Sequence, residues 1–182
     1  MAKFNSKRRI QKALFELLRE RSIDKITVSE VVDKAGVSRT SYYRAYGSLQ
    51  SVVDDALDEL FGKIESLAPQ TEGLSAESEE KEFERAISEV LTLYHDNADQ
   101  LRMLLDGSAD KTFRNRLFSF TLAAFPMHDE VQGGMTADTM RQIYMAAGTT
   151  AVVCRWVESG CELPISDMTD FIMQKRREAL GK

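Results

Sequence analysis

Signals that begin, end and restart a helix lie close together near the N-terminus, and they constrain the fold more than any other stretch. Thr27 is followed three residues later by Glu30, which is the arrangement of a capping box at a helix start. Gly36 predicts the end of this helix, because glycine readily adopts the left-handed conformation common at helix ends. Ser38 then predicts the start of a second helix. The segment therefore predicts two short helices joined by a tight turn.

The second predicted helix, residues 39–46, is short, aromatic and basic. In a helix-turn-helix, the second helix enters the major groove of DNA and its first side chains reach base edges. We expect contacts to bases from Arg39, Thr40 and Tyr42, and contacts to phosphates from Lys7, Thr27, Ser38 and Tyr43. Ser41 and Arg44 complete the predicted DNA-binding set. The alternative is an ordinary amphipathic helix pair inside an all-α domain.

The net charge of −5 is divided unequally along the chain. Residues 1–50 hold 11 Lys and Arg against 5 Asp and Glu, a balance of +6, so the remaining residues carry −11. A basic N-terminal part on an acidic remainder favours binding of a polyanion through the basic part, although a solvated basic face is the alternative. No apolar run approaches membrane-spanning length and no signal peptide is apparent, so we expect a cytoplasmic protein without a membrane partner.

Apolar residues at helical spacing recur along the chain and predict about nine helices and an all-α fold. The outward-facing acids of the helix at 48–66, Asp54, Asp55, Asp58 and Glu59, are expected to be solvated. Residues 68–78 form the one clear linker, 126–135 form a loop, and Ser166 is the expected N-cap of the last helix. The predicted helices cover about 6–21, 28–35, 39–46, 48–66, 79–95, 97–105, 110–125, 136–159 and 166 onward.

The run ITVSEVVDKAGVSRTSYYRAYGSLQSVVDDAL resembles the N-terminal domain of TetR-family transcriptional regulators over about the first 60 residues. The residues that fall on the family pattern are Val37, Ser38, Tyr42, Tyr43, Arg44 and Tyr46. One departure is Leu49, because the family usually has a lysine there that helps hold the phosphate backbone. The later stretch GTTAVVCRWVESGCELPISDM resembles the penultimate helix of many family members and the turn that follows it.

The resemblance implies an N-terminal three-helix helix-turn-helix DNA-binding domain over residues 1–47, connected through the helix at 48–66. Residues 48–182 would form a helical effector-binding and dimerisation domain. By the same resemblance, residues from about 137 to 180 pair across a two-fold axis in a homodimer. The expected interface residues are Thr149, Val152, Val153, Trp156, Phe171 and Ile172.

The C-terminal part is rich in Phe, Met and Tyr, which could line a cavity between helices. The resemblance implies a small effector there, and the scarcity of charges on these helix faces favours a largely apolar one. The candidate pocket residues are Met103, Phe113, Leu117, Phe120, Met140 and Tyr144. For each of them, simple filling of the core is the alternative.

No motif for catalysis, metal or cofactor binding is apparent, so we expect no enzyme activity, no metal and no cofactor. Cys154 and Cys161 are expected to be buried thiols. The sequence favours a ligand-responsive regulator, a repressor, that binds a palindromic operator in double-stranded DNA as a homodimer. The alternative is a TetR-like protein-interaction regulator with weak or lost DNA binding, and Leu49 is its support.

Overall fold

The structure is a computed structural model that describes residues 2–105, 110–124 and 135–180. Within these ranges the chain is helical and contains no strand, so the expected all-α fold is confirmed. The elements are α1 (Ala2–Leu18), the 3-10 turn η1 (Ile23–Lys25), α2 (Val28–Ala35), α3 (Arg39–Ala45), α4 (Leu49–Ser66), α5 (Ala76–Asp96), α6 (Ala98–Leu105), α7 (Asp110–Ala124), α8 (Ala137–Glu158) and α9 (Ile165–Ala179).

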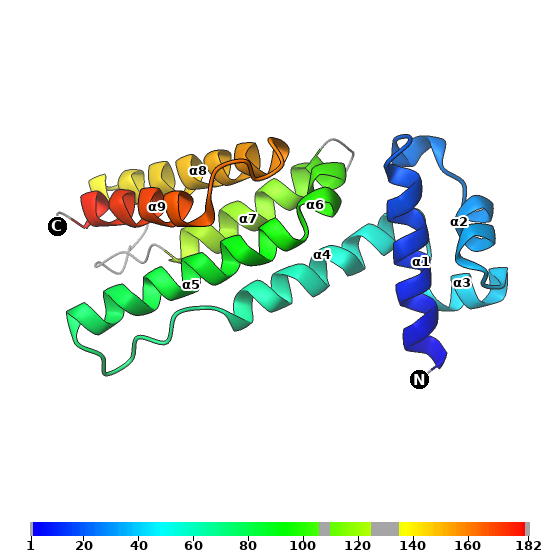
Figure 1. Cartoon of the computed structure of the whole chain (residues 1–182), viewed down its shortest axis with the longest axis horizontal. Helices are drawn as coiled ribbons and strands as arrows, with labels where there is room; N and C mark the ends of the chain where they lie inside the picture. Colours follow the sequence, from blue (N-terminus) through cyan, green and yellow to red (C-terminus); the bar gives the residue numbers. More distant parts are fainter. Residues whose placement is uncertain (1, 106–109, 125–134, 181–182) are drawn as a thin grey trace.

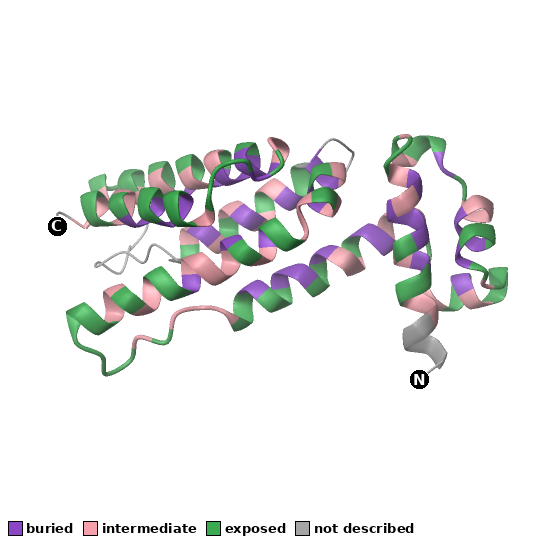
Figure 2. Cartoon of the chain, viewed as in Figure 1, coloured by how far each residue is buried: buried purple, intermediate pink, exposed green. Residues whose placement is uncertain are grey.

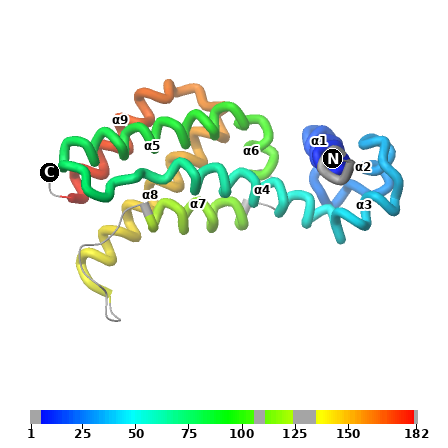
Figure 3. Tube along the Cα trace, turned by 90° about the horizontal axis from the view of Figure 1, so that it is seen from below, coloured from blue at the N-terminus to red at the C-terminus, as the bar shows by residue number. Residues whose placement is uncertain are grey.

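The helices form two groups that are connected by α4 (Figure 1). The first group, called the head here, consists of α1, α2 and α3. The second group, called the body, consists of α5 to α9. A view from below confirms that the molecule is elongated, with the head at one end and the C-terminus at the other (Figure 3). Helix α1 packs against α2, α3 and α4, and it also touches α6 where head and body meet.

The head follows from the local signals in the sequence. The Thr27 hydroxyl accepts a hydrogen bond from the backbone of Glu30, and the Glu30 carboxylate accepts one from the backbone of Thr27, which completes the capping box. Gly36 ends α2 with φ of +59°, and a Cβ added there would lie 2.6 Å from Nη2 of Arg9. Ser38 caps α3 by accepting a hydrogen bond from the backbone of Ser41. The predicted pair of helices and the tight turn are therefore present.

Helix α4 carries one buried stripe along most of its length (Figure 2). At its start, Val52 and Val53 pack in the core of the head, and further along Phe61 lies 5.9 Å from Phe113 of α7 between ring centroids. One continuous apolar core therefore passes from the head into the body. Fully burying a Val or Phe side chain contributes about 1.5–3 kcal/mol, so this stripe fixes the direction in which α4 leaves the head.

The body packs α5 against α9, and α8 against α6, α7 and α9. The turn between α8 and α9 is held by the Trp156 indole, which donates a 2.9 Å hydrogen bond to the carbonyl of Leu163. The last helix begins at Ile165, so the prediction of Ser166 as its N-cap is wrong. Pro164 precedes the first turn and fixes the entry of the chain instead, and the Ser166 hydroxyl bonds to Asp167.

Other expectations concern single residues and short segments. The predicted loop at 126–135 lies, except for residue 135, outside the described residues. Cys154 and Cys161 are buried and form no disulfide. No helix in the described part of the chain is long and apolar enough to cross a membrane.

Candidate functional site

Helix α3 has one face in the core of the head and one face in solvent. Tyr42 is fully buried, and its ring lies 6.2 Å from that of Tyr46 one turn later. Both side chains therefore anchor the helix in the core, and Tyr46 contacts Lys7 of α1 and Asp55 of α4. Burial raises the pKa of Tyr42 to about 12, so its hydroxyl stays neutral at physiological pH. The expectation that Tyr42 contacts bases is wrong, because the helical period turns its ring inward.

The exposed face of α3 carries Arg39, Thr40, Tyr43 and Arg44, with Ser38 at its start. Tyr43 is 58% exposed, although its ring edge rests against the buried ring of Tyr42 at 5.3 Å between centroids. Two guanidinium groups and a phenol thus extend from one side of a short helix. This is the combination of charge and hydrogen-bond donors that phosphates and guanine edges accept.

The side chain of Arg39 is held in place by the preceding helix. Its Nη2 donates a 2.5 Å hydrogen bond to the hydroxyl of Ser29 in the first turn of α2. A guanidinium fixed at one nitrogen loses less rotamer freedom when its other nitrogens bind a partner. Ser29 was not among the predicted site residues, because a contact between two helices leaves no local signal in the sequence.

Three other predicted DNA-binding residues, Thr27, Ser38 and Ser41, take part in helix caps. The Thr27 hydroxyl is exposed and donates a 2.7 Å hydrogen bond to Glu30. The Ser38 hydroxyl donates a 2.9 Å hydrogen bond to the hydroxyl of Ser41, which is half-buried. These caps leave Thr27 and Ser38 at the surface beside the start of α3, and both hydroxyl oxygens keep acceptor capacity.

Lys7 lies in a different environment from the one expected for a phosphate contact. Its Nζ is 2.8 Å from the carboxylate of Asp55 and 5.2 Å from the ring centroid of Tyr46. Asp55 also accepts a 2.6 Å hydrogen bond from the Tyr46 hydroxyl and a 3.2 Å one from Gln11. This Asp55 cluster joins α1, the end of α3 and α4, so the expectation that Asp55 is merely solvated is wrong.

The electrostatics of the Asp55 cluster favour the ionised carboxylate. Partial burial works to raise the pKa of Asp55, but the hydrogen bonds from Lys7 and Tyr46 outweigh it and hold the pKa below its usual value. Burial, and then the bond to Asp55, raise the pKa of Tyr46 well above its usual value. The cluster therefore stays a charged, hydrogen-bonded joint across the physiological pH range.

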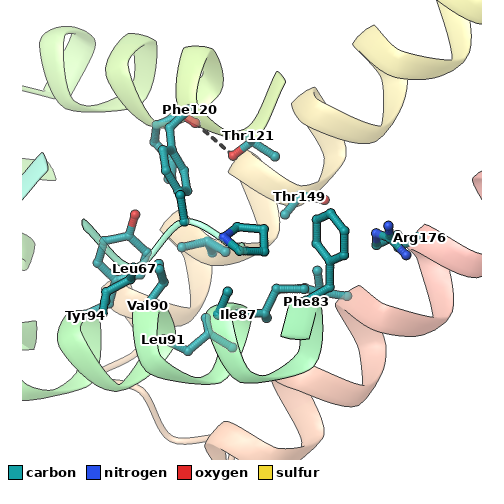
Figure 4. A pocket seen from close by; sticks show the side chains of 16 residues that line it. Leu67, Phe83, Ile87, Val90, Leu91, Tyr94, Phe120, Thr121, Thr149 and Arg176 are labelled. Carbon is teal, nitrogen blue, oxygen red and sulfur yellow. Dashed lines mark hydrogen bonds between the residues drawn. The ribbon is translucent and has the colours of Figure 1, made fainter. Parts of the chain in front are cut away.

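The predicted pocket residues separate into different environments. Leu117 and Phe120 line a cavity of about 80 Å³ in the body, between α5, α7, α8 and α9 (Figure 4). Phe113 is fully buried in the continuous core. Met103 faces a groove between α1 and α6. Met140 and Tyr144 are 54% and 78% exposed on α8, so they do not line the cavity.

The cavity has polar groups that the sequence did not single out. Tyr94 and Arg176 line it from α5 and α9, and Thr121 and Thr149 line it from α7 and α8. The spacing of Phe83, Ile87 and Val90 is consistent with Tyr94 on the inner face of α5, but only helix packing decides that this face borders a cavity. No spacing rule connects Tyr94 with Arg176, because the two helices are far apart in the sequence.

The six predicted interface residues also differ in exposure. Phe171 is 40% exposed, and Thr149 and Val152 are half-buried. Val153, Trp156 and Ile172 are buried inside the chain, so they are not available for a partner in this structure. The exposed face of α8 instead carries Met140, Ile143, Tyr144, Ala147, Gly148 and Ala151.

No family model matches the chain, and no curated protein matches it in sequence. Solved structures do match. A TetR-like transcriptional regulator from a Rhodococcus species has a TM-score of 0.65 at 19% identity, with 97% of each chain covered. A TetR transcriptional regulator from Streptococcus agalactiae has a TM-score of 0.64 at 19% identity, with 95% of this chain and 94% of that chain covered. A dihydroxyacetone kinase operon activator has a TM-score of 0.60 at 13% identity, with 97% and 94% covered.

Proposed function

We propose that this chain, which has the fold of TetR-family transcriptional regulators, is a sequence-specific DNA-binding regulator that acts as a homodimer. The observation that carries the proposal is the exposed face of α3, where Arg39 is oriented by Ser29 on a part of the chain with a balance of +6. A short helix that follows a tight turn and bears such side chains suits the major groove.

The side chains of the head have different roles in this proposal. Arg39 and Thr40 contact base edges, because they lie in the first turn of α3. Tyr43 and Arg44, with the caps Thr27 and Ser38, contact phosphates. Lys7 acts indirectly, since its bond to Asp55 positions α1 and α3 on α4. The proposed DNA-binding domain is residues 1–47, and residues 48–182 form the effector-binding and dimerisation domain.

The proposed dimer forms through the exposed face of α8 together with Phe171 of α9. The first turns of α8 project beyond the rest of the body (Figure 3), and Met140, Ile143 and Tyr144 are exposed there. Farther along, Ala147, Gly148 and Ala151 are exposed and small enough for a second helix to approach closely. Exposed apolar surface of this kind commonly marks an interface. Two copies of α3 then bind two half-sites of a palindromic operator.

In this proposal the protein is a cytoplasmic repressor whose affinity for the operator depends on a small effector bound in the body. An effector changes DNA binding only if it binds one arrangement of the dimer better than the other. The direction of regulation is tested by a reporter gene placed under the selected operator, with and without the protein. Lower expression with the protein is expected, and higher expression would make it an activator.

The experiment that tests the proposed function is selection of bound sequences from a random double-stranded DNA library at a fixed, stated salt concentration. Enrichment of a palindrome with half-sites about one helical turn, roughly 34–36 Å, apart or a small multiple of it is expected. Failure to enrich any sequence at low salt would contradict the proposal. The affinity of the selected site is then measured against salt, because phosphate contacts give a linear loss on logarithmic axes.

A second candidate function rests on Leu49. This residue occupies the position of the usual phosphate-binding lysine, and it is partly buried against the core of the head. It therefore packs the start of α4 and makes no phosphate contact. If the salt dependence is flat and no site is enriched, the protein is better explained as a TetR-like regulator that binds another protein.

A further inference from the structure

The cavity in the body is almost entirely apolar. Phe83, Ile87 and Val90 of α5 lie across it from Phe120 of α7 (Figure 4). The segment that follows α4 also lines it, through Leu67, Ala68 and Pro69. An apolar cavity of this kind excludes water, because water needs two to four polar partners to be stable there. The space therefore suits a molecule that is itself mostly apolar.

One polar group in the cavity wall has no partner. The hydroxyl of Tyr94 is buried, and no hydrogen-bond acceptor for it exists among the described residues. Its ring is fixed by the edge-to-face contact with Phe113, at 6.4 Å between centroids. Burial raises the pKa of Tyr94 far above its usual value, so the group remains an O–H donor. Buried donors are normally satisfied, and this one lacks only an acceptor.

The charge in the wall already has a partner, Glu80, which it shares with Arg177. Among the described residues that line the cavity, Arg176 is the only charged one. Its guanidinium is 3.3 Å from the carboxylate of Glu80 and stacks 3.7 Å above the ring of Phe83. A ligand carboxylate would have to displace Glu80, and a ligand cation would meet the guanidinium. The wall therefore favours a neutral ligand.

The two polar ends of the cavity are well separated. Phe83, against which Arg176 stacks, and Tyr94 are 11 residues apart on α5, which corresponds to about 16 Å along the helix. Tyr94 and Arg176 accordingly lie at opposite sides of the cavity (Figure 4). A small molecule that reaches the Tyr94 hydroxyl lies away from the ion pair at the other end.

We propose that this cavity binds a small, neutral, mainly apolar molecule with one hydrogen-bond acceptor that faces the hydroxyl of Tyr94. The inference deepens the proposed function and rests on it for the regulatory role of the ligand, whereas binding itself is independent of DNA. The cavity, about 80 Å³, is smaller than an engineered cavity of roughly 150 Å³ that binds benzene. A molecule with a single ring therefore enters by displacing the segment around Pro69, whose neighbour Gln70 is held by a 3.1 Å hydrogen bond to Glu82.

The test compares two probes of the same shape on the full-length protein without DNA, by titration calorimetry. Acetophenone carries a carbonyl oxygen where α-methylstyrene carries a methylene group. Acetophenone should bind about five- to tenfold more tightly, because only it satisfies the donor. In Tyr94→Phe the preference should disappear while α-methylstyrene binds as before. Because the lost hydroxyl has no partner, this variant should fold at least as stably as the wild type.

Two further variants serve as controls. Thr92→Val removes an exposed hydroxyl from α5, outside the cavity and the proposed interface, and should keep the preference of the wild type. Val90→Phe fills the cavity and should abolish binding of both probes. The proposal is overturned if neither probe binds the wild type, if Val90→Phe still binds both, or if Tyr94→Phe keeps the preference. An operator selected without probe binding would overturn this inference alone, and probe binding without an operator would overturn the proposed function alone.

Discussion

The head and the body expose different kinds of surface. Tyr43 is the only large hydrophobic side chain exposed on the described part of the head, where residues 1–50 carry a balance of +6. The remainder of the chain carries −11, yet α8 exposes Met140, Ile143 and Tyr144. A basic surface with few apolar groups suits a polyanion, and apolar side chains on an acidic part suit a second protein surface. Under the proposed function each end of the molecule has its own partner, and variants at either end test this.

The largest effect is expected when the apolar face of α8 receives a charge. Ala147→Glu adds a carboxylate to the exposed stripe without filling the core, so the folded monomer should remain. The resulting monomer contacts only one half-site. Its affinity for the operator should be about 10²–10⁴-fold lower, because the avidity of two linked contacts is lost. Sedimentation velocity and operator titration measure the two changes.

A matched control for Ala147→Glu exists on α5. Ala76→Glu adds the same carboxylate at another exposed alanine, in the first turn of α5, where helices tolerate acids well. It should remain dimeric and bind the operator normally. A dimer of unchanged mass in Ala147→Glu would show that the interface lies elsewhere.

The next effect concerns base contacts from the head. Arg39→Ala should cost about 1–3 kcal/mol in binding to the selected operator and should relax one position of it. Arg44→Ala, on the same helix, should weaken operator and random DNA alike and flatten the salt slope. Equal losses for Arg39→Ala on operator and random DNA would remove Arg39 from the base contacts.

A smaller effect is expected at the joint between the head and α4. Asp55→Ala removes an acceptor of three hydrogen bonds and should lower the free energy of unfolding by about 1–2 kcal/mol. The adjacent Asp54 is exposed and bonds only to Gln50 of its own helix among the described contacts. Asp54→Ala should therefore change stability by less than about 0.5 kcal/mol. Urea unfolding measures both variants. Equal losses in the free energy of unfolding would show that the Asp55 cluster contributes nothing to stability.

The smallest effect is a pH dependence that should be shared by head and body. Hydrogen bonds from Thr27, and then from Arg21, lower the pKa of Glu30 from 4.5 to about 2. In the body, Arg85 and the backbone of Gln70 lower the pKa of Glu82 to about 2. A depressed folded-state pKa stabilises the fold above pH 4.5, and that contribution is lost as the pH falls towards 2.

The pKa values of Glu30 and Glu82 can be measured by following their side-chain carboxyl carbon chemical shifts as a function of pH. Both should titrate near pH 2 in the folded protein. The stability difference between the wild type and Glu30→Gln should be constant above pH 4.5 and should shrink below it. A midpoint near 4.5 for Glu30 would mean that its side of the capping box is not formed in solution.

The sequence predicts the head better than the body because of the range of the interactions involved. Thr27, Gly36 and Ser38 act on backbone groups within four residues, so their effects are visible in the local pattern. The inward orientation of Tyr42 was not predicted, because an aromatic ring with a hydroxyl suits both a protein core and a contact in the DNA groove. Asp55 was missed because its partners come from α1 and from the end of α3.

In the body, the predicted helices were largely present but their contacts could not be assigned. Periodicity identifies an apolar face, yet it does not say whether that face meets another helix, a cavity or a second chain. Met140 and Tyr144 were therefore expected in a pocket although they lie on the surface. Val153, Trp156 and Ile172 were expected at an interface although they fill the core, and Tyr94 and Arg176 come to line one cavity only in the folded chain.

The division of α3 into an anchored and an exposed face has an evolutionary consequence under the proposed function. Tyr42 and Tyr46 hold the helix from within, whereas Arg39, Thr40 and Tyr43 contribute little to its packing. Substitutions at the exposed positions should therefore change the preferred operator at almost no cost in folding. A duplicated gene with this fold could acquire a new target site through a few such changes while its core stays as it is.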